Sequence, residues 1–174
     1  MSDIENLDNL LNKLNRISNE IVPKALKQGV WQATERVRAE AVLLCPVNYG
    51  ELRQSIKSTI SKQNDVITGT VFTNKEYAKY VEFGTGKRGR ENHKGISPEV
   101  NVSYTNTGWY IPAEEFSDAD ILKYHLNVVN IKGKDFVYTE GQPAQPFLYP
   151  AIKNNKKIAS NLIKSQVERS LKNL

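Results

Sequence analysis

Apolar residues recur at steps of three and four along two stretches near the start of the chain, which is the period of an amphipathic helix. The first stretch lies within residues 1–22, and its stripe consists of Ile4, Leu7, Leu10, Leu11, Leu14, Ile17 and Ile21. Pro23 should interrupt this helix, because proline lacks an N–H and crowds the preceding turn. We therefore predict a second, central helix over residues 24–44, whose stripe consists of Leu26, Val30, Ala33, Val37, Ala41 and Leu44.

The middle of the chain has the pattern of antiparallel strands. Residues 66–73 are dense in threonine and β-branched side chains, which favour strands, and they should pair with residues 58–61 across a turn at 62–65. Residues 100–104 and 109–112 read as further short strands, and residues 118–126 as a short helix. Residues 128–131 and 136–139 flank Lys132-Gly133-Lys134-Asp135, which predicts a hairpin.

A short helix over residues 77–83 is predicted to end at two glycines. Tyr80, Val81 and Phe83 can share one helix face, and Gly84 suits the position after a helix end, where a positive φ is cheap only for glycine. Residues 85–98 then contain several glycines and four basic residues, and we predict a surface loop there. The basic residues are Lys87, Arg88, Arg90 and Lys94.

The end of the chain predicts a last helix over residues 150–174, because Pro150 suits a first helical turn and apolar residues recur after it. The whole pattern predicts an α+β fold in one domain spanning residues 1–174. An antiparallel β-sheet would pack against the long central helix and the C-terminal helix, and the N-terminal helix over residues 1–22 would be free to project.

Composition narrows the class of protein. The 174 residues are 39% hydrophobic, include one cysteine and carry a net charge of +5. No apolar run approaches the ~18 residues that a membrane span needs, and the acidic start of the chain is unlike a signal peptide. We expect synthesis in a reducing cytoplasm, no internal disulfide and no membrane. A basic protein can bind nucleic acid or an acidic partner, including a copy of itself.

No set of residues predicts catalysis, a metal or a cofactor. Cys45, His93 and His125 are too far apart in sequence to suggest a zinc site. Gly84-Thr85-Gly86 lacks the downstream lysine of a phosphate-binding loop. The acidic residues Glu114, Glu115, Asp118 and Asp120 have no histidine or lysine arranged with them, so we interpret them as a solvated face. The protein is therefore predicted not to be an enzyme.

Three short segments, in this order, resemble a family of tailed-bacteriophage neck proteins. The second and third match the family pattern well, and in the first Asn48 and Tyr49 replace an aspartate and a threonine. The segments consist of Pro46-Val47-Asn48-Tyr49-Gly50-Glu51-Leu52 with Ser55, of Tyr80-Val81-Glu82-Phe83-Gly84-Thr85, and of Pro146-Phe147-Leu148 before the last helix. The resemblance covers roughly residues 25 to 171.

This resemblance implies a structural role in the virion, at the junction between head and tail. The protein would be made in a bacterial cytoplasm and would form a homo-oligomeric ring, for which we favour sixfold over twelvefold symmetry. The basic loop from Lys87 to Lys94 would face the channel of this ring or a neighbouring subunit. Its partners would be the head connector or head-closure protein and the tail terminator or tail tube protein, with non-specific contact to DNA in the channel. The alternative is a small basic nucleic-acid-binding protein, and a monomer that binds DNA tightly would favour it.

Phe147 and Leu148 are held between Pro146 and the start of the last helix. Burying either side chain is worth about 1.5–3 kcal/mol, so both should be covered. We favour the interpretation that they seal the core over the alternative that they form an exposed docking patch for the next ring.

Overall fold

The computed structural model describes the backbone of residues 2–173 and the side chains of residues 6–173. The chain divides into two compact units. The helical unit consists of Met1–Lys75 and Phe147–Leu174, and the inserted unit consists of Glu76–Pro146. The α+β class is confirmed, whereas a single domain over residues 1–174 stays a prediction.

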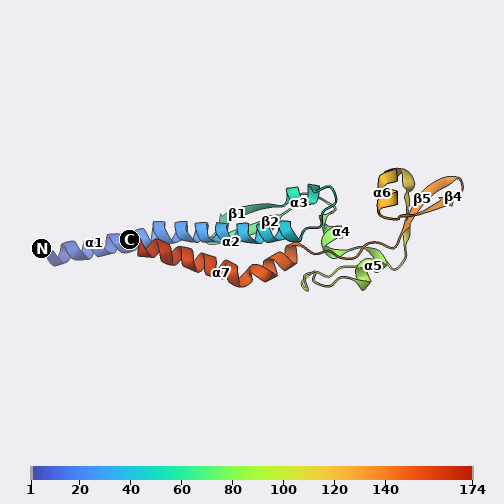
Figure 1. Ribbon diagram of the computed structural model, residues 1–174. Helices are drawn as coiled ribbons and strands as arrows, with labels where there is room; N and C mark the ends of the chain where they lie inside the picture. Colours follow the sequence, from blue (N-terminus) through green and yellow to red (C-terminus); the bar gives the residue numbers. More distant parts are fainter. Residues whose placement is uncertain (1, 174) are drawn as a thin grey trace. The chain divides into compact units, whose positions relative to one another are not determined.

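The helical unit is built around α2 (Val22–Leu44). The helix α7 (Leu148–Lys172) packs along one side of α2, and the hairpin of β1 (Lys57–Gln63) and β2 (Val66–Phe72) lies on the other side (Figure 1). Contacts between α2 and α7 run from Gln28–Gln166 at one end to Glu40–Asn154 at the other, so the two helices are antiparallel. A short helix, α3 (Glu51–Ser55), leads into β1.

Small and apolar side chains form the core of this unit. The buried positions of α2 recur mainly every four residues, and they include a glycine and three alanines that allow close packing. They are Ala25, Gly29, Ala33, Thr34, Val37 and Ala41. The predicted stripe was correct for Ala33, Val37 and Ala41, but Leu44 is 41% exposed. The stripe was also expected to pack on a sheet, whereas α7 is the main partner of α2.

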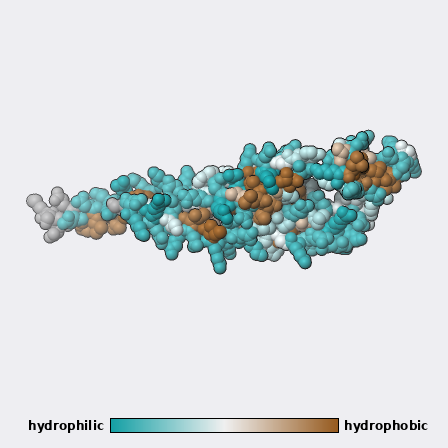
Figure 2. Space-filling model, in the orientation of Figure 1, coloured by the Kyte–Doolittle hydropathy of each residue, from teal (hydrophilic) through white to brown (hydrophobic). Residues whose placement is uncertain are grey.

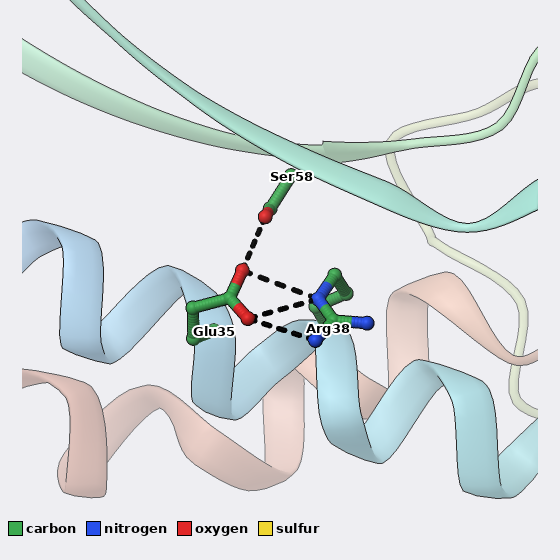
Figure 3. A network of polar contacts seen from close by, with 3 residues as sticks. All are labelled: Glu35, Arg38 and Ser58. Carbon is green, nitrogen blue, oxygen red and sulfur yellow. Dashed lines mark hydrogen bonds and ion pairs between the residues drawn. The ribbon is translucent and has the colours of Figure 1, made fainter.

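The hairpin is joined to α2 by polar contacts as well as by packing. Arg38 donates hydrogen bonds of 2.8 to 3.1 Å to the Glu35 carboxylate, and Ser58 of β1 donates to the same group (Figure 3). These hydrogen bonds, first from Arg38 and then from Ser58, hold the Glu35 pKa below its ordinary value of 4.5. The carboxylate therefore links the helix to the sheet in its charged form.

Pro23 does not break the helix, contrary to the prediction. The chain passes from α1 (Ser2–Arg16) through the wider π-turn η1 (Ile17–Ile21) into α2. The Val22 N–H bonds to the Ile17 carbonyl five residues back, and Pro23 falls in the first turn of α2. A π-turn inserts an extra residue into the helix, and here it accommodates a residue that has no N–H to donate.

The inserted unit contains the helices α4 (Ala78–Phe83), α5 (Gly86–Glu91) and α6 (Asp118–Lys123), and the 3-10 turn η2 (Ala113–Glu115). It also contains an antiparallel sheet in the order β3 (Trp109–Pro112), β5 (Lys134–Thr139), β4 (Asn127–Ile131). The hairpin between β4 and β5 is therefore confirmed. Among the described residues, the expected single sheet is divided between the two units.

Two predictions for this unit are wrong. Residues 85–98 are not a continuous loop, because residues 86–91 form α5, in which Gly86 and Gly89 are buried. Residues 100–104 are irregular and not a strand. In the helical unit, the last helix begins at Leu148 and not at Pro150 as predicted. Pro150 then lies in the first turn, where a residue without an N–H costs no hydrogen bond.

Candidate functional site

The second segment singled out in the sequence lies side by side, within the inserted unit, with residues 142–145, which directly precede the third segment. The Thr85 N–H donates to the Gln142 carbonyl at 2.9 Å, and the Gln142 N–H donates back to the Thr85 hydroxyl at 3.1 Å. Gln145 N–H bonds to the Val81 carbonyl at 2.8 Å, and the Gln142 side chain bonds to the Tyr80 carbonyl at the same distance. The two segments, about sixty residues apart, thus form one backbone-paired element.

Gly84 is required by this pairing. Its φ of +74° is in a region that side chains disfavour, and a Cβ atom there would lie 2.7 Å from the Ala144 backbone nitrogen. The glycine therefore stops α4 and lets the chain approach residues 142–144. The expectation that Gly84 follows a helix end with a positive φ is correct.

An aromatic hollow of about 640 Å³ opens beside the paired segments. Tyr80 and Phe83 of α4 contribute to its wall, together with Tyr104 and with Trp109 of β3. Tyr80 is 49% exposed, and the Lys79 ammonium lies 5.1 Å from the centre of its ring. Such a hollow can accept an apolar or aromatic side chain from another protein, with a cation at its edge.

Tyr104 holds one wall of the hollow in place. Its hydroxyl donates a 2.7 Å hydrogen bond to the Phe83 carbonyl at the end of α4, and its ring stacks on His93 at 5.8 Å. Burial raises the pKa of Tyr104 above its ordinary value of 10.0, so the hydroxyl remains a donor at neutral pH. Sequence analysis missed Tyr104, because its segment was read as a strand.

The four basic residues of the predicted loop have different surroundings. Lys87 lies 3.6 Å from the Glu140 carboxylate, and Arg90 donates to the side chain of Asn106. Arg88 and Lys94 are exposed. Lys87 and Arg90 thus contact other side chains of the inserted unit, whereas Arg88 and Lys94 extend into solvent.

The remaining motif residues differ in how far they are buried. Glu82 is 4% exposed and Phe147 is 0% exposed, whereas Pro146 and Leu148 are partly exposed. A side chain as buried as Phe147 cannot form an exposed docking patch. Its burial instead supports the interpretation that it seals the core.

The described residues bear on two further kinds of feature, clusters of metal-ligating side chains and helices that could span a membrane. No group of three or more histidine, cysteine or acidic residues in the described part could hold a metal ion. Within the same residues, none of the helices is both long and apolar enough to cross a bilayer.

The comparison with protein families gives a match over part of the chain. Residues 8–84 match the family described as "Bacteriophage HK97-gp10, putative tail-component". No curated protein and no solved structure is significantly similar to the chain. The matched segment contains α2, the β1–β2 hairpin and α4, and it ends at Gly84. Over these residues the chain is therefore similar to the HK97-gp10-like tail components of bacteriophages, in agreement with the tailed-phage family that its motifs resemble.

Proposed function

We propose that the protein is a structural component of the neck of a tailed bacteriophage and joins the head connector to the tail. The family match over residues 8–84 carries this proposal, because it independently selects a phage tail component. The bond from the Gln145 N–H to the Val81 carbonyl supports it further. It connects the second motif, inside the matched region, to the residues directly before the third motif, outside that region, as expected if the resemblance extends along the chain.

The neck role requires contacts on two sides. One partner would be the connector or head-closure protein, and the other would be the tail terminator or the tail tube protein. The protein would act as a ring of identical subunits, with six copies favoured and twelve the alternative. Head-to-tail contacts between identical subunits close into a ring when a whole number of the rotations between neighbours adds up to a full turn.

The exposed basic residues Arg88 and Lys94 would face the channel or a neighbouring subunit of the ring. In the channel they would make sequence-independent contacts with DNA phosphates, and added salt would weaken these contacts. The double change Arg88→Glu with Lys94→Glu should leave the fold intact, because exposed charges contribute about 0–1 kcal/mol each. It should reduce particle assembly or DNA retention. The matched control is Lys156→Glu with Lys157→Glu on α7, which makes the same charge change on exposed residues elsewhere.

Electron microscopy of lysates from a phage that lacks the gene tests the neck role. The proposal predicts separate DNA-filled or emptied heads and complete tails, and it predicts joined particles again when the wild-type protein is supplied. Joined, infectious particles in the absence of the protein would refute it. A purified chain that stays monomeric and binds DNA tightly in low salt, with no effect of its loss on particles, would favour the nucleic-acid-binding alternative.

A further inference from the structure

The helix α1 presents an apolar face that the rest of the helical unit leaves uncovered. Leu7, Leu10, Leu11 and Leu14 are 48–55% exposed, and Figure 2 shows hydrophobic surface over this helix. An isolated helix of this length is marginal in water, and most helical stability in proteins comes from packing an apolar face. The helix therefore needs a partner that buries its leucines.

A groove on the same unit has the properties of that partner. One hollow of about 320 Å³ lies between Pro23 on α2, Ile60 on β1 and Ile67 on β2. A second, of about 500 Å³, continues along α2 to Trp31 and shares Lys27 and Ile60 with the first. Trp31 is 43% exposed, so the groove offers a large apolar contact at its far end.

Charge distinguishes this groove from other apolar surfaces. Its rim carries Lys24 and Lys27 on α2, Lys62 on β1 and Arg169 on α7. The Lys62 ammonium lies 2.9 Å from the Asp65 carboxylate, and both side chains are solvent-exposed. In the α1 sequence, Asp3, Glu5 and Asp8 precede the two bases Lys13 and Arg16, so the acidic residues gather in its first half. The acidic first half of this leucine-rich helix thus complements a basic, apolar groove.

The two surfaces cannot meet within one chain while the helix is intact. The groove begins at Pro23, directly after η1, and helical backbone is continuous from α1 through η1 into α2. In Figure 1, α1 continues the line of α2 and so leads away from the groove. To reach its own groove, α1 would have to break η1 and reverse direction. A second copy can present α1 without that cost.

We propose that α1 of one copy docks in the groove between α2 and the β1–β2 hairpin of a second copy. Each chain then supplies one helix and one groove, so the contact is head-to-tail and can be repeated around a ring. The part of this inference that makes the docking a contact between ring subunits rests on the proposed function. The docking itself is a form of self-association, and it can be tested on the purified chain alone.

Cross-linking tests the docking directly. Two variants of different tag size are mixed: Asn15→Cys, at an exposed position one turn from Leu11 that borders the leucine face of α1, and Ser61→Cys on the groove rim. Native Cys45 is buried, and the wild-type chain controls for it. We expect a mixed disulfide dimer at a rate at least about ten times that of Asn15→Cys mixed with Lys156→Cys on α7, which lies outside the groove. Equal rates would overturn the inference. So would faster dimer formation by Asn15→Cys alone, because that result would mean that α1 pairs with α1.

Sedimentation equilibrium supplies a second measurement. Leu10→Asp on α1, and Lys24→Glu with Lys27→Glu in the groove, should each raise the dissociation constant at least about tenfold, with unchanged circular dichroism. Lys156→Glu with Lys157→Glu should leave the constant unchanged. A wild-type chain that is monomeric at every concentration would overturn the inference. Such a result would leave the neck role to be decided by the particles, because that test does not depend on how the purified chain associates.

Discussion

Gly29 of α2 lies so close to Ile163 of α7 that a Cβ atom at position 29 would be 2.8 Å from the Ile163 Cα atom. Backbone atoms of a long helix cannot move aside singly, so any side chain at position 29 must push the two helices apart. The glycine thus sets the distance between the two longest helices of the helical unit.

The change Gly29→Ala should consequently destabilise the protein. In an exposed helix interior alanine is favoured over glycine by about 1 kcal/mol, but overpacking a tight contact costs about 1–3 kcal/mol. We expect a lower free energy of unfolding in urea. The control is Ala39→Gly at an exposed position of α2, because it measures the difference in helix propensity between alanine and glycine without a tight contact. A Gly29→Ala variant that is more stable than the wild type would contradict the close approach.

Asn155 makes the α2–α7 contact specific. It is 1% exposed, its amide donates to the Ala151 carbonyl at 2.8 Å, and its oxygen accepts from Arg36 Nε at 3.0 Å. Asn155→Ala should lower the free energy of unfolding by about 1–3 kcal/mol, because buried polar partners are lost. The neighbouring change Asn154→Ala, at an exposed position, should cost less than about 0.5 kcal/mol. Equal losses in chemical denaturation would show that Asn155 has no special role.

The Glu35 carboxylate should make stability depend on pH (Figure 3). Its pKa is lowered in the folded state, chiefly by the Arg38 hydrogen bonds, so its contribution is present above its ordinary value of 4.5. The contribution is lost as the pH falls through the folded-state pKa. Glu35→Gln should therefore lower the free energy of unfolding near pH 7 by about 0.5–1.5 kcal/mol. The difference from wild type should shrink below pH 4.5. A difference that is constant from pH 7 to pH 3 would be inconsistent with this role.

Phe147 should be an energetic anchor of the helical unit, because its side chain is completely buried. Phe147→Ala should cost about 3–5 kcal/mol through lost burial and an unfilled cavity. Ile152→Ala serves as the control, since Ile152 lies on α7, which begins directly after Phe147, but is 58% exposed. Unfolding is followed by circular dichroism during a urea titration. An unchanged midpoint for Phe147→Ala would contradict its place in the core.

Local patterns in the sequence predicted the elements whose structure is decided locally. The period of α2, the β-branched run of β2 and the Lys132-Gly133 turn each correspond to observed elements. The helix α5 was missed because two glycines give its sequence a poor helix propensity. Its form depends on contacts from far along the chain, including the Arg88 N–H bond to the Glu140 carbonyl at 3.2 Å. Sequence periodicity does not contain such contacts.

The candidate site was predictable in part for the same reason. The segment around Tyr80 and Phe83 was singled out from its aromatic and glycine pattern, and both residues line the hollow. Tyr104 and Trp109 complete its wall from a region that has little regular structure. Likewise, the sequence indicated that Lys87 and Arg90 were equivalent to Arg88 and Lys94. Only the fold shows which of them have partners within the inserted unit.

The central claim, a neck protein that joins head to tail, is tested most directly by cryo-electron microscopy of the intact virion. We expect density that fits the α2–α7 pair and the β1–β2 hairpin at the head–tail junction, repeated six times around the axis or, in the alternative, twelve. Absence of the chain from mature particles, or its location only at the tail tip, would contradict the claim.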